Sequence, residues 1–134
     1  MSSLFTKIIK GEIPTYKIYE NDRVFVFLDI YPISLGHTLI ISKTEIDQWT
    51  DLPLEDYLAI QTVAQKIGNA IKKATNCKRI GQIVDGREIP HCHLHLIPLV
   101  DGQAINQKSE QKLIAAPTPQ EFANLQSQII KNLK

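Results

Sequence analysis

Three of the four histidines of this chain lie at alternate positions of the stretch IPHCHLHLIPL, residues 89–99. In an extended strand, successive side chains point to opposite faces, so His91, His93 and His95 would share one face, about 7 Å apart at Cα. The intervening Cys92 would point to the other face, toward a core. Histidine titrates near neutral pH, so three of them on one face predict a site of chemistry.

Two kinds of chemistry fit this spacing. Two histidines at alternate strand positions can bind one zinc ion if a third ligand comes from elsewhere, and His37 is the remaining histidine of the chain. Alternatively, a neutral imidazole attacks phosphorus or carbon, while neighbouring imidazoles bind anionic oxygens or protonate a leaving group. Three histidines without a chemical role are the third interpretation. The spacing alone leaves metal binding and nucleophilic catalysis both open.

The rest of the chain predicts an α+β fold in which an antiparallel sheet carries the histidines. Residues 50–76 have apolar side chains at three- and four-residue spacing, which indicates one long amphipathic helix. Thr118, Pro119 and Glu121 form a capping-box pattern that begins a C-terminal helix over residues 119–133. Five runs rich in β-branched and aromatic residues are expected strands: residues 17–21, 23–30, 35–42, 79–85 and 89–99.

Length and composition exclude several classes of protein. A chain of 134 residues that is 43% hydrophobic predicts one domain with its own core. A net charge of +1 gives no field that would attract nucleic acid or an anionic membrane. The N-terminal residues carry charges and no uninterrupted apolar run, so neither a signal peptide nor a membrane span is expected. Two cysteines make no disulfide framework, so a cytoplasmic protein is expected.

The motif HCHLHLI, residues 91–97, resembles the His-x-His-x-His-x-x signature of the histidine triad (HIT) superfamily. The resemblance extends to LFTKIIKGEIP near the N-terminus, to FVFLDIYPISLGHTLIISK and to GREIPHCHLHLIP, and it is closest to the Hint-like branch. It implies one HIT-like domain over residues 1–134, with a core at about 4–99 and a loop plus C-terminal helix at 102–134. It also implies a homodimer that needs no cofactor.

By this resemblance, the chain is a nucleotide-binding hydrolase that acts at the α-phosphate of nucleoside phosphoramidates or adenylated compounds and releases a nucleoside monophosphate. His93 would attack phosphorus and form a covalent nucleotidyl intermediate. His91 and His95 would flank it, contact phosphate oxygens and assist the leaving group, while His37 would support them from the neighbouring strand. Two alternatives stay open: a diadenosine polyphosphate hydrolase, and a regulatory or scaffold protein with incidental turnover.

The resemblance also implies a set of nucleotide-binding residues. Asp29 would accept hydrogen bonds from both ribose hydroxyls, as a carboxylate can. Arg87 stands in a loop that is shorter than in relatives, where it would hold an extra phosphate or point to solvent. Tyr31 replaces a small polar residue, so substrate choice is where this chain would differ from relatives. The remaining members of the nucleotide-binding set are Leu4, Phe5, Ile8, Ile13, Phe27, Ile30, Leu39 and Glu88.

A structural zinc is the one metal that the resemblance raises. Many bacterial relatives bind it through two cysteines and two histidines. The corresponding positions here are Ser3, Thr6 and Glu45, and only His91 is retained. Zinc in proteins is held by thiolate, imidazole and carboxylate groups, so with three of the four ligands replaced together no metal is expected.

Overall fold

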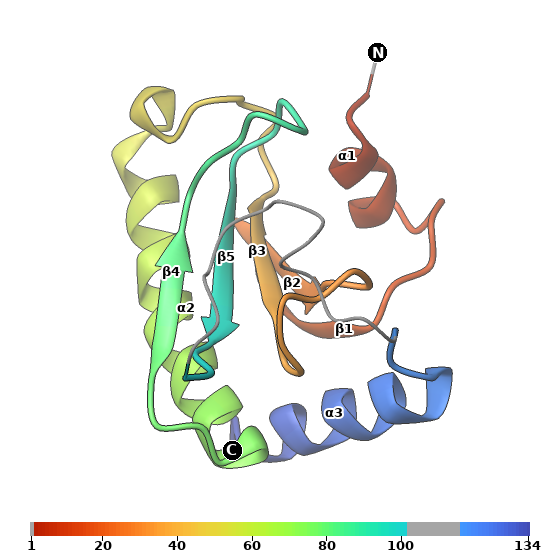
Figure 1. Cartoon of the computed structure of the whole chain (residues 1–134). Helices are drawn as coiled ribbons and strands as arrows, with labels where there is room; N and C mark the ends of the chain where they lie inside the picture. Colours follow the sequence, from red (N-terminus) through yellow and green to blue (C-terminus); the bar gives the residue numbers. More distant parts are fainter. Residues whose placement is uncertain (1, 102–115) are drawn as a thin grey trace.

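The computed structural model describes residues 2–101 and 116–134 (Figure 1). One antiparallel sheet has the order β1-β2-β3-β5-β4. Its strands are β1 (Lys17–Glu20), β2 (Val24–Leu28), β3 (Thr38–Ser42), β4 (Ile80–Ile83) and β5 (His93–Pro98). The helical elements are α1 (Leu4–Ile9), a 3-10 turn η1 (Trp49–Asp51), α2 (Leu54–Thr75) and α3 (Pro119–Lys131). The expected α+β fold is therefore confirmed.

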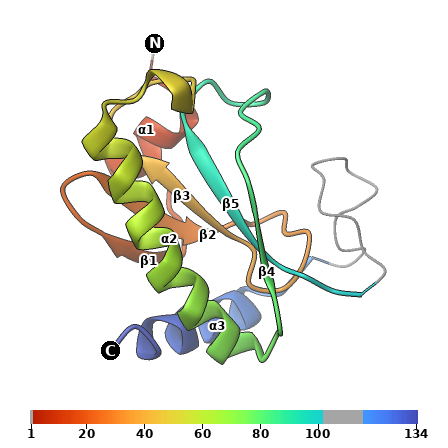
Figure 2. The same ribbon diagram turned by 90° about the vertical axis from the view of Figure 1, so that its left-hand side faces the viewer.

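Helix α2 covers one face of the sheet and α1 lies on the other, as the two views together show (Figures 1 and 2). The helix ends at Asn76, whose left-handed backbone (φ 59°) cannot continue it. Its buried stripe is the one that the periodicity predicts. The stripe packs on the inward side chains of β2, β3 and β5, and the main members of this core are Ile60, Val63, Ile67, Ile71, Val26, Ile40, Cys92, Leu94 and Leu96.

The opposite face of the sheet carries a second, smaller apolar cluster beneath α1. Phe5 and Ile8 of α1 pack there against side chains of β2 and β3. In the pairing of β3 with β5, Ile41 lies opposite His93 and Leu39 lies opposite His95. Directly opposite residues project to the same side of a sheet, so both histidines face α1 rather than α2. This register places two histidines beside an apolar helix face.

The C-terminal helix closes one end of the domain. Thr118 and Glu121 form the predicted capping box, in which each side chain accepts from the other residue's backbone N–H. Phe122 is buried and its ring stacks on Tyr16 at a centroid distance of 5.0 Å. Burying such a side chain contributes roughly 1.5–3 kcal/mol, so the two buried side chains of α3, Phe122 and Ile129, hold it on the domain.

The structure departs from the sequence expectation at the start of the histidine strand. Strand β5 begins at His93 rather than at residue 89, and His91 lies in a bend closed by its own N–H donating to the carbonyl of Ile89 at 2.8 Å. The polar loop expected at residues 102–116 falls almost entirely outside the described residues. Within the part of the chain that is described, no helix is long and apolar enough to cross a membrane.

Candidate active site

A cavity of about 600 Å³ lies between α1 and the sheet, within the size range of small-molecule sites. His93 and His95 lie on its wall, as does Glu88. The predicted nucleotide-binding residues that line it are Leu4, Phe5, Ile8, Ile13, Phe27, Asp29, Ile30, Leu39 and Glu88. Most of these side chains are apolar, so the cavity combines a hydrophobic wall with a small polar end.

His93 is held in one tautomer by a backbone carbonyl. Its Nδ1 lies 2.7 Å from the carbonyl oxygen of His91. A carbonyl can only accept, so Nδ1 carries the proton and the lone pair of the neutral ring is on Nε2. Burial lowers the pKa of His93 below its usual 6.5, against a smaller upward contribution from the bond to His91. The ring is therefore a neutral imidazole at neutral pH, with its nucleophilic atom opposite the anchored one.

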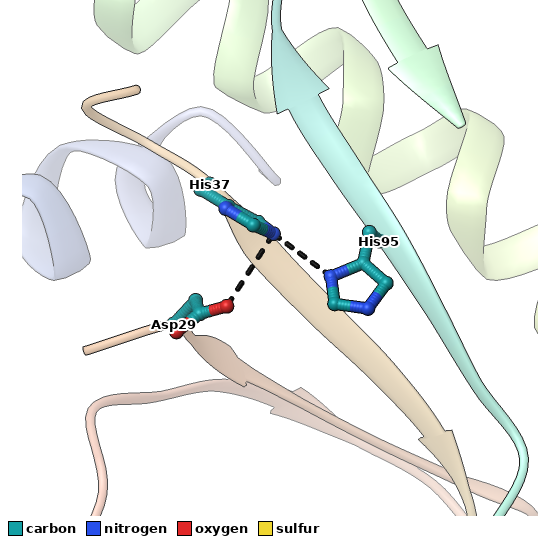
Figure 3. A group of neighbouring side chains, drawn as sticks. All are labelled: Asp29, His37 and His95. Carbon is teal, nitrogen blue, oxygen red and sulfur yellow. Dashed lines mark hydrogen bonds and ion pairs between the residues drawn. The ribbon is translucent and has the colours of Figure 1, made fainter. Parts of the chain in front are cut away.

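His95, His37 and Asp29 form a connected group (Figure 3), and two of its members, His95 and Asp29, line the cavity. The backbone N–H of Ile33 donates to Nδ1 of His37 at 3.0 Å, so the proton of neutral His37 is on Nε2. That atom lies 2.9 Å from Nδ1 of His95 and 3.4 Å from Oδ2 of Asp29. His95 thus accepts at Nδ1 and carries its own proton on Nε2, which makes it a hydrogen-bond donor.

The same three side chains are where a cation would find ligand atoms. Within residues 2–101 and 116–134, Asp29, His37 and His95 form the group whose possible ligand atoms all lie within 4.8 Å of one another. The separation of 2.9 Å between the two histidines is a hydrogen-bond distance with a proton between the nitrogens. In this geometry the group is a proton-sharing network rather than a metal centre.

The ring of His91 lies on the α1 side of the sheet, edge-on to Phe5, but outside the cavity lining. Its ring is fully buried, and Nε2 donates to the carbonyl oxygen of Ser42 at 2.6 Å while Nδ1 lies 2.6 Å from the hydroxyl oxygen of Ser3. Both ring nitrogens therefore bond to protein atoms, and the ring is not among the groups that line the cavity. We expected His91 to contact phosphate; the structure brings its backbone carbonyl, not its ring, into contact with His93.

The polar residues at the mouth of the cavity are arranged around Asp29 and the short loop. Asp29 accepts from the backbone N–H of Tyr31 at 2.8 Å, which fixes the turn after β2. Tyr31 lines the cavity but is 70% exposed. Arg87 donates twice to Asp85, at 2.6 and 2.7 Å, and this pairing lowers the pKa of Asp85 to about 2. The side chain of Arg87 is 86% exposed, and Arg87 is not among the residues that line the cavity.

Backbone groups and a hydroxyl from a distant part of the sequence bond to the histidine rings, and no sequence motif identifies them. The carbonyls of His91 and Ser42 and the N–H of Ile33 set the tautomers of the three rings. Every residue type carries these groups, so no sequence pattern marks them. Ser3 was singled out as a replaced metal ligand, and its contact with His91 spans 88 residues of sequence.

The fold and this site define a nucleotide-binding domain of the histidine triad type, and comparison with known proteins agrees. The family model described as HIT domain matches residues 10–102. An uncharacterized HIT-like protein of Borreliella burgdorferi is 33% identical over 137 residues, covering 97% of each chain. Adenosine 5′-monophosphoramidase of Saccharomyces cerevisiae is 37% identical over 102 residues, which cover 75% of this chain and 65% of the yeast protein.

A solved structure of a histidine triad family protein has the same fold. The zinc-bound histidine triad family protein of Mycobacterium smegmatis superposes with a TM-score of 0.82 at 26% identity, covering 99% of this chain and 94% of that chain. The chain belongs to the HIT family, whose members include nucleotide-binding hydrolases and transferases.

The four positions where the resemblance places zinc ligands do not carry a zinc-binding set in this chain. Ser3, Thr6, Glu45 and His91 do lie together here, but two of them offer only hydroxyl groups. Nδ1 of His91 accepts a hydrogen bond from Ser3, so it is not presented to an ion. This donor set does not fit a tetrahedral zinc site, for which thiolate and imidazole ligands are typical.

Proposed function

We propose that this chain hydrolyses nucleoside phosphoramidates or related adenylated compounds at the α-phosphate, through a covalent nucleotidyl intermediate on His93. The observation that carries the proposal is the tautomer of His93: its Nδ1–H is bonded to the carbonyl of His91, which directs the lone pair of Nε2 away from that anchor on a ring that lines the cavity. The similarity to a phosphoramidase supports the choice of substrate class.

The cavity offers a separate environment to each part of a nucleotide. The apolar wall, with Phe5, Ile8 and Phe27, suits the base. Asp29 lines the cavity, and its carboxylate would accept from the ribose hydroxyls. The α-phosphate would then lie against His93 and His95. An imidazole N–H and a neutral nucleophile meet an anionic phosphate without the repulsion that a carboxylate would cause.

The first step would be displacement at phosphorus. Nε2 of His93 attacks the α-phosphorus and forms a P–N bond, while the bond from phosphorus to the leaving amine breaks. An amine nitrogen leaves poorly as an anion, so the departing nitrogen takes a proton from solvent, while the Nε2–H of His95 donates a hydrogen bond that assists its departure. His95 is suited to this because its proton is already on that atom. Covalent capture divides one difficult displacement into two easier ones.

The second step would regenerate the enzyme. A water molecule attacks the nucleotidyl phosphorus, the bond to His93 breaks, and the proton of the water passes to solvent. The products are a nucleoside monophosphate and a neutral His93, and His95 keeps its proton on Nε2 throughout. His37 acts as a positioning residue here, since its Nε2–H holds Nδ1 of His95 as an acceptor throughout.

We further infer a homodimer built on α2 and β4. In the described sheet β4 is an edge strand, with β5 on one side. A polar groove of about 530 Å³ runs between α2 and β4 and is lined by Gln61, Gln65, Gly68, Asn69, Lys72 and Gln82. An edge strand presents unpaired N–H and C=O groups that a second copy can pair. The edge strand β4 and the groove beside it support the dimer that the family resemblance implies, with this face as the contact surface.

The test of function is turnover of an adenosine phosphoramidate by the wild-type chain and by His93→Ala. We expect the wild type to release AMP and the variant to lose turnover while still binding AMP, since the base wall and Asp29 are untouched. Normal turnover by the variant would rule out His93 as the nucleophile. Diadenosine tetraphosphate is the second substrate to assay. Preference for it would reassign the leaving group, and binding of nucleotide without turnover of either would indicate a binding protein.

A further inference from the structure

Ser3, Thr6 and Glu45 form a closed hydrogen-bonded cluster around the ring of His91. One carboxylate oxygen of Glu45 accepts from the backbone N–H of Ser3 at 2.7 Å and from the hydroxyl of Thr6 at 2.6 Å. These two bonds hold the pKa of Glu45 below its usual value. The hydroxyl of Ser3 accepts from the backbone N–H of Thr6 at 3.0 Å and lies 2.6 Å from Nδ1 of His91.

The direction of every hydrogen bond in this cluster follows from its chemistry. The carbonyl of Ser42 can only accept, so the proton of neutral His91 is on Nε2. Nδ1 is then an acceptor, and the hydroxyl of Ser3 must donate to it. The carboxylate of Glu45 can only accept, so the hydroxyl of Thr6 donates to it. The ring is thus held at both nitrogens, and the hydroxyl of Thr6 lies farther from Nδ1, at 3.5 Å, than the hydroxyl of Ser3 does.

His91 in turn holds the nucleophile. Its carbonyl accepts from Nδ1 of His93 at 2.7 Å, and it lies in the bend just before β5 rather than in the sheet ladder. The peptide group of that carbonyl is also held by the N–H of Cys92, which donates to the carbonyl of Ile46 at 2.7 Å, so this backbone bond and the anchored side chain of His91 orient it together. Phe5 of α1 contacts both rings edge-on, with centroids 5.7 Å from His91 and 4.9 Å from His93. The cluster thus joins the wall of the cavity to the nucleophile.

We propose that Ser3 and Glu45 are positioning residues for catalysis, which fix the ring of His91 through hydrogen bonds and so orient the carbonyl that selects the reactive tautomer of His93. In this cluster, hydroxyl and carboxylate groups hold the ring of His91 by hydrogen bonds, and the set of donor atoms does not fit a metal ion. Activity then depends on a hydroxyl donor at residue 3, through a contact that never touches substrate. The catalytic part of this inference rests on the proposed function.

The test separates the hydroxyl of Ser3 from its role as the N-cap of α1. Glycine is nearly as good an N-cap as serine, so Ser3→Gly removes the donor to His91 while costing the helix little. Ser3→Thr keeps the donor, and Ser2→Gly changes the exposed neighbour as a matched control. A misplaced nucleophile loses rate rather than affinity. We expect Ser3→Gly to lower kcat about 10-fold with KM changed less than about 2-fold, and the other two to match the wild type.

For the carboxylate, Glu45→Gln keeps an acceptor oxygen and Glu45→Ala removes it, with Asp47→Ala as the exposed acidic control in the same segment. We expect Glu45→Ala to lower kcat like Ser3→Gly and Glu45→Gln to retain most of it. Rates are normalised to the amount of nucleotidyl-enzyme formed in the first turnover, so a lower folded fraction does not count as loss of kcat. Equal normalised kcat in Ser3→Gly and wild type would overturn the proposal.

A second readout does not need turnover. Nitrogen-15 NMR distinguishes the two tautomers of each histidine ring, so it reports the protons on His91 and His93 directly. We expect Ser3→Gly to make the Nδ1–H form of His93 less populated, and Ser3→Thr and Ser2→Gly to leave it unchanged. Unchanged ring tautomers in Ser3→Gly would refute the positioning role of Ser3, even if the enzyme is active. If the wild type shows no turnover while the tautomers shift, the proposed function fails and the positioning stands.

Discussion

The Nδ1–H of His93 donates to the carbonyl oxygen of His91, two residues earlier in the chain, at 2.7 Å. This one bond decides which nitrogen of His93 can react. Burial lowers the pKa of the ring and so sets the pH range in which it is a neutral nucleophile. Its place on the cavity wall determines which ligand it can reach.

The pH dependence of turnover should report the state of His93. Burial lowers its pKa below 6.5, so the ring is neutral and reactive at neutral pH. We expect kcat/KM to be flat near pH 7 and to fall on the acid side with an apparent pKa under about 6.5, as protonation removes the nucleophilic lone pair. The native state binds fewer protons than the unfolded chain here, so its stability also falls as the pH drops below about 6.5. An acid limb centred above that value would contradict the assignment.

Asp29 should determine whether the enzyme distinguishes ribose from its deoxy forms. Loss of a hydrogen bond to a charged group costs about 1.5–3 kcal/mol, which corresponds to roughly 10- to 100-fold in affinity. We expect Asp29→Ala to weaken AMP binding by that factor and to bind AMP and 3′-deoxy-AMP alike, whereas the wild type prefers AMP. Calorimetric titration with both ligands measures it, and a wild type that does not discriminate would exclude ribose contact by Asp29.

Gly36, next to His37, should tolerate no side chain. Its φ of +97° suits glycine, and a Cβ there would lie 2.9 Å from Cγ2 of Thr75 and 3.2 Å from Cγ of Pro98. We expect Gly36→Ala to lower the free energy of unfolding by more than about 2 kcal/mol, combining backbone strain with overpacking. Gly11, at φ +80° with open space around it, is the control, and Gly11→Ala should cost about 1–2 kcal/mol. Equal urea midpoints for the two variants would argue against the close contact.

The two cysteines should differ sharply in reactivity. Cys92 is buried in the core under α2, and burial raises the pKa of its thiol to about 11. Cys77, after the end of α2, is half-buried. We expect iodoacetamide at neutral pH to label Cys77 and to reach Cys92 only on unfolding, because the thiolate is the reactive form. Peptide mass spectrometry with and without urea provides the check, and rapid native labelling of Cys92 would be the unexpected result.

The inferred dimer predicts an effect of charge in the groove between α2 and β4. A Cβ at Gly68 meets nothing within 4 Å, so Gly68→Arg fits the protomer but would fill the surface that a second copy covers. We expect sedimentation velocity to show a dimer for the wild type and a monomer for this variant. Thr62→Arg, on the same helix but outside the groove lining, should remain a dimer. A monomeric wild type would remove the dimer from the account.

The sequence predicts the framework well because periodicity reports burial directly. The three- and four-residue spacing in residues 50–76 corresponds to the buried stripe of α2. Strand alternation correctly places Cys92 in the core under α2, on the other face of the sheet from His93. The same alternation places His91 on the α1 side with His93, where Phe5 contacts both rings. It does not show that the chain bends before β5, or that His91 bonds to Ser42 and lies outside the cavity lining. Strand periodicity carries no information about where a strand begins.

What the sequence could not predict is mainly the set of partners of each ring. Backbone groups of His91, Ser42 and Ile33 fix the tautomers, and a carbonyl or N–H has no residue type to recognise. The contact between Ser3 and Glu45 joins residues 42 positions apart. Such a contact depends on the docking of α1 on the sheet, which follows from the tertiary packing of Phe5 and Ile8 rather than from any local pattern.

The most direct test of the account is to trap the covalent intermediate. Wild-type protein mixed with adenosine phosphoramidate, quenched within the first turnover and digested at neutral or alkaline pH, should yield one adenylylated peptide, modified at His93. His93→Ala should yield none, although it still binds AMP. Turnover by the wild type without any adduct, or an adduct on a residue other than His93, would contradict the account.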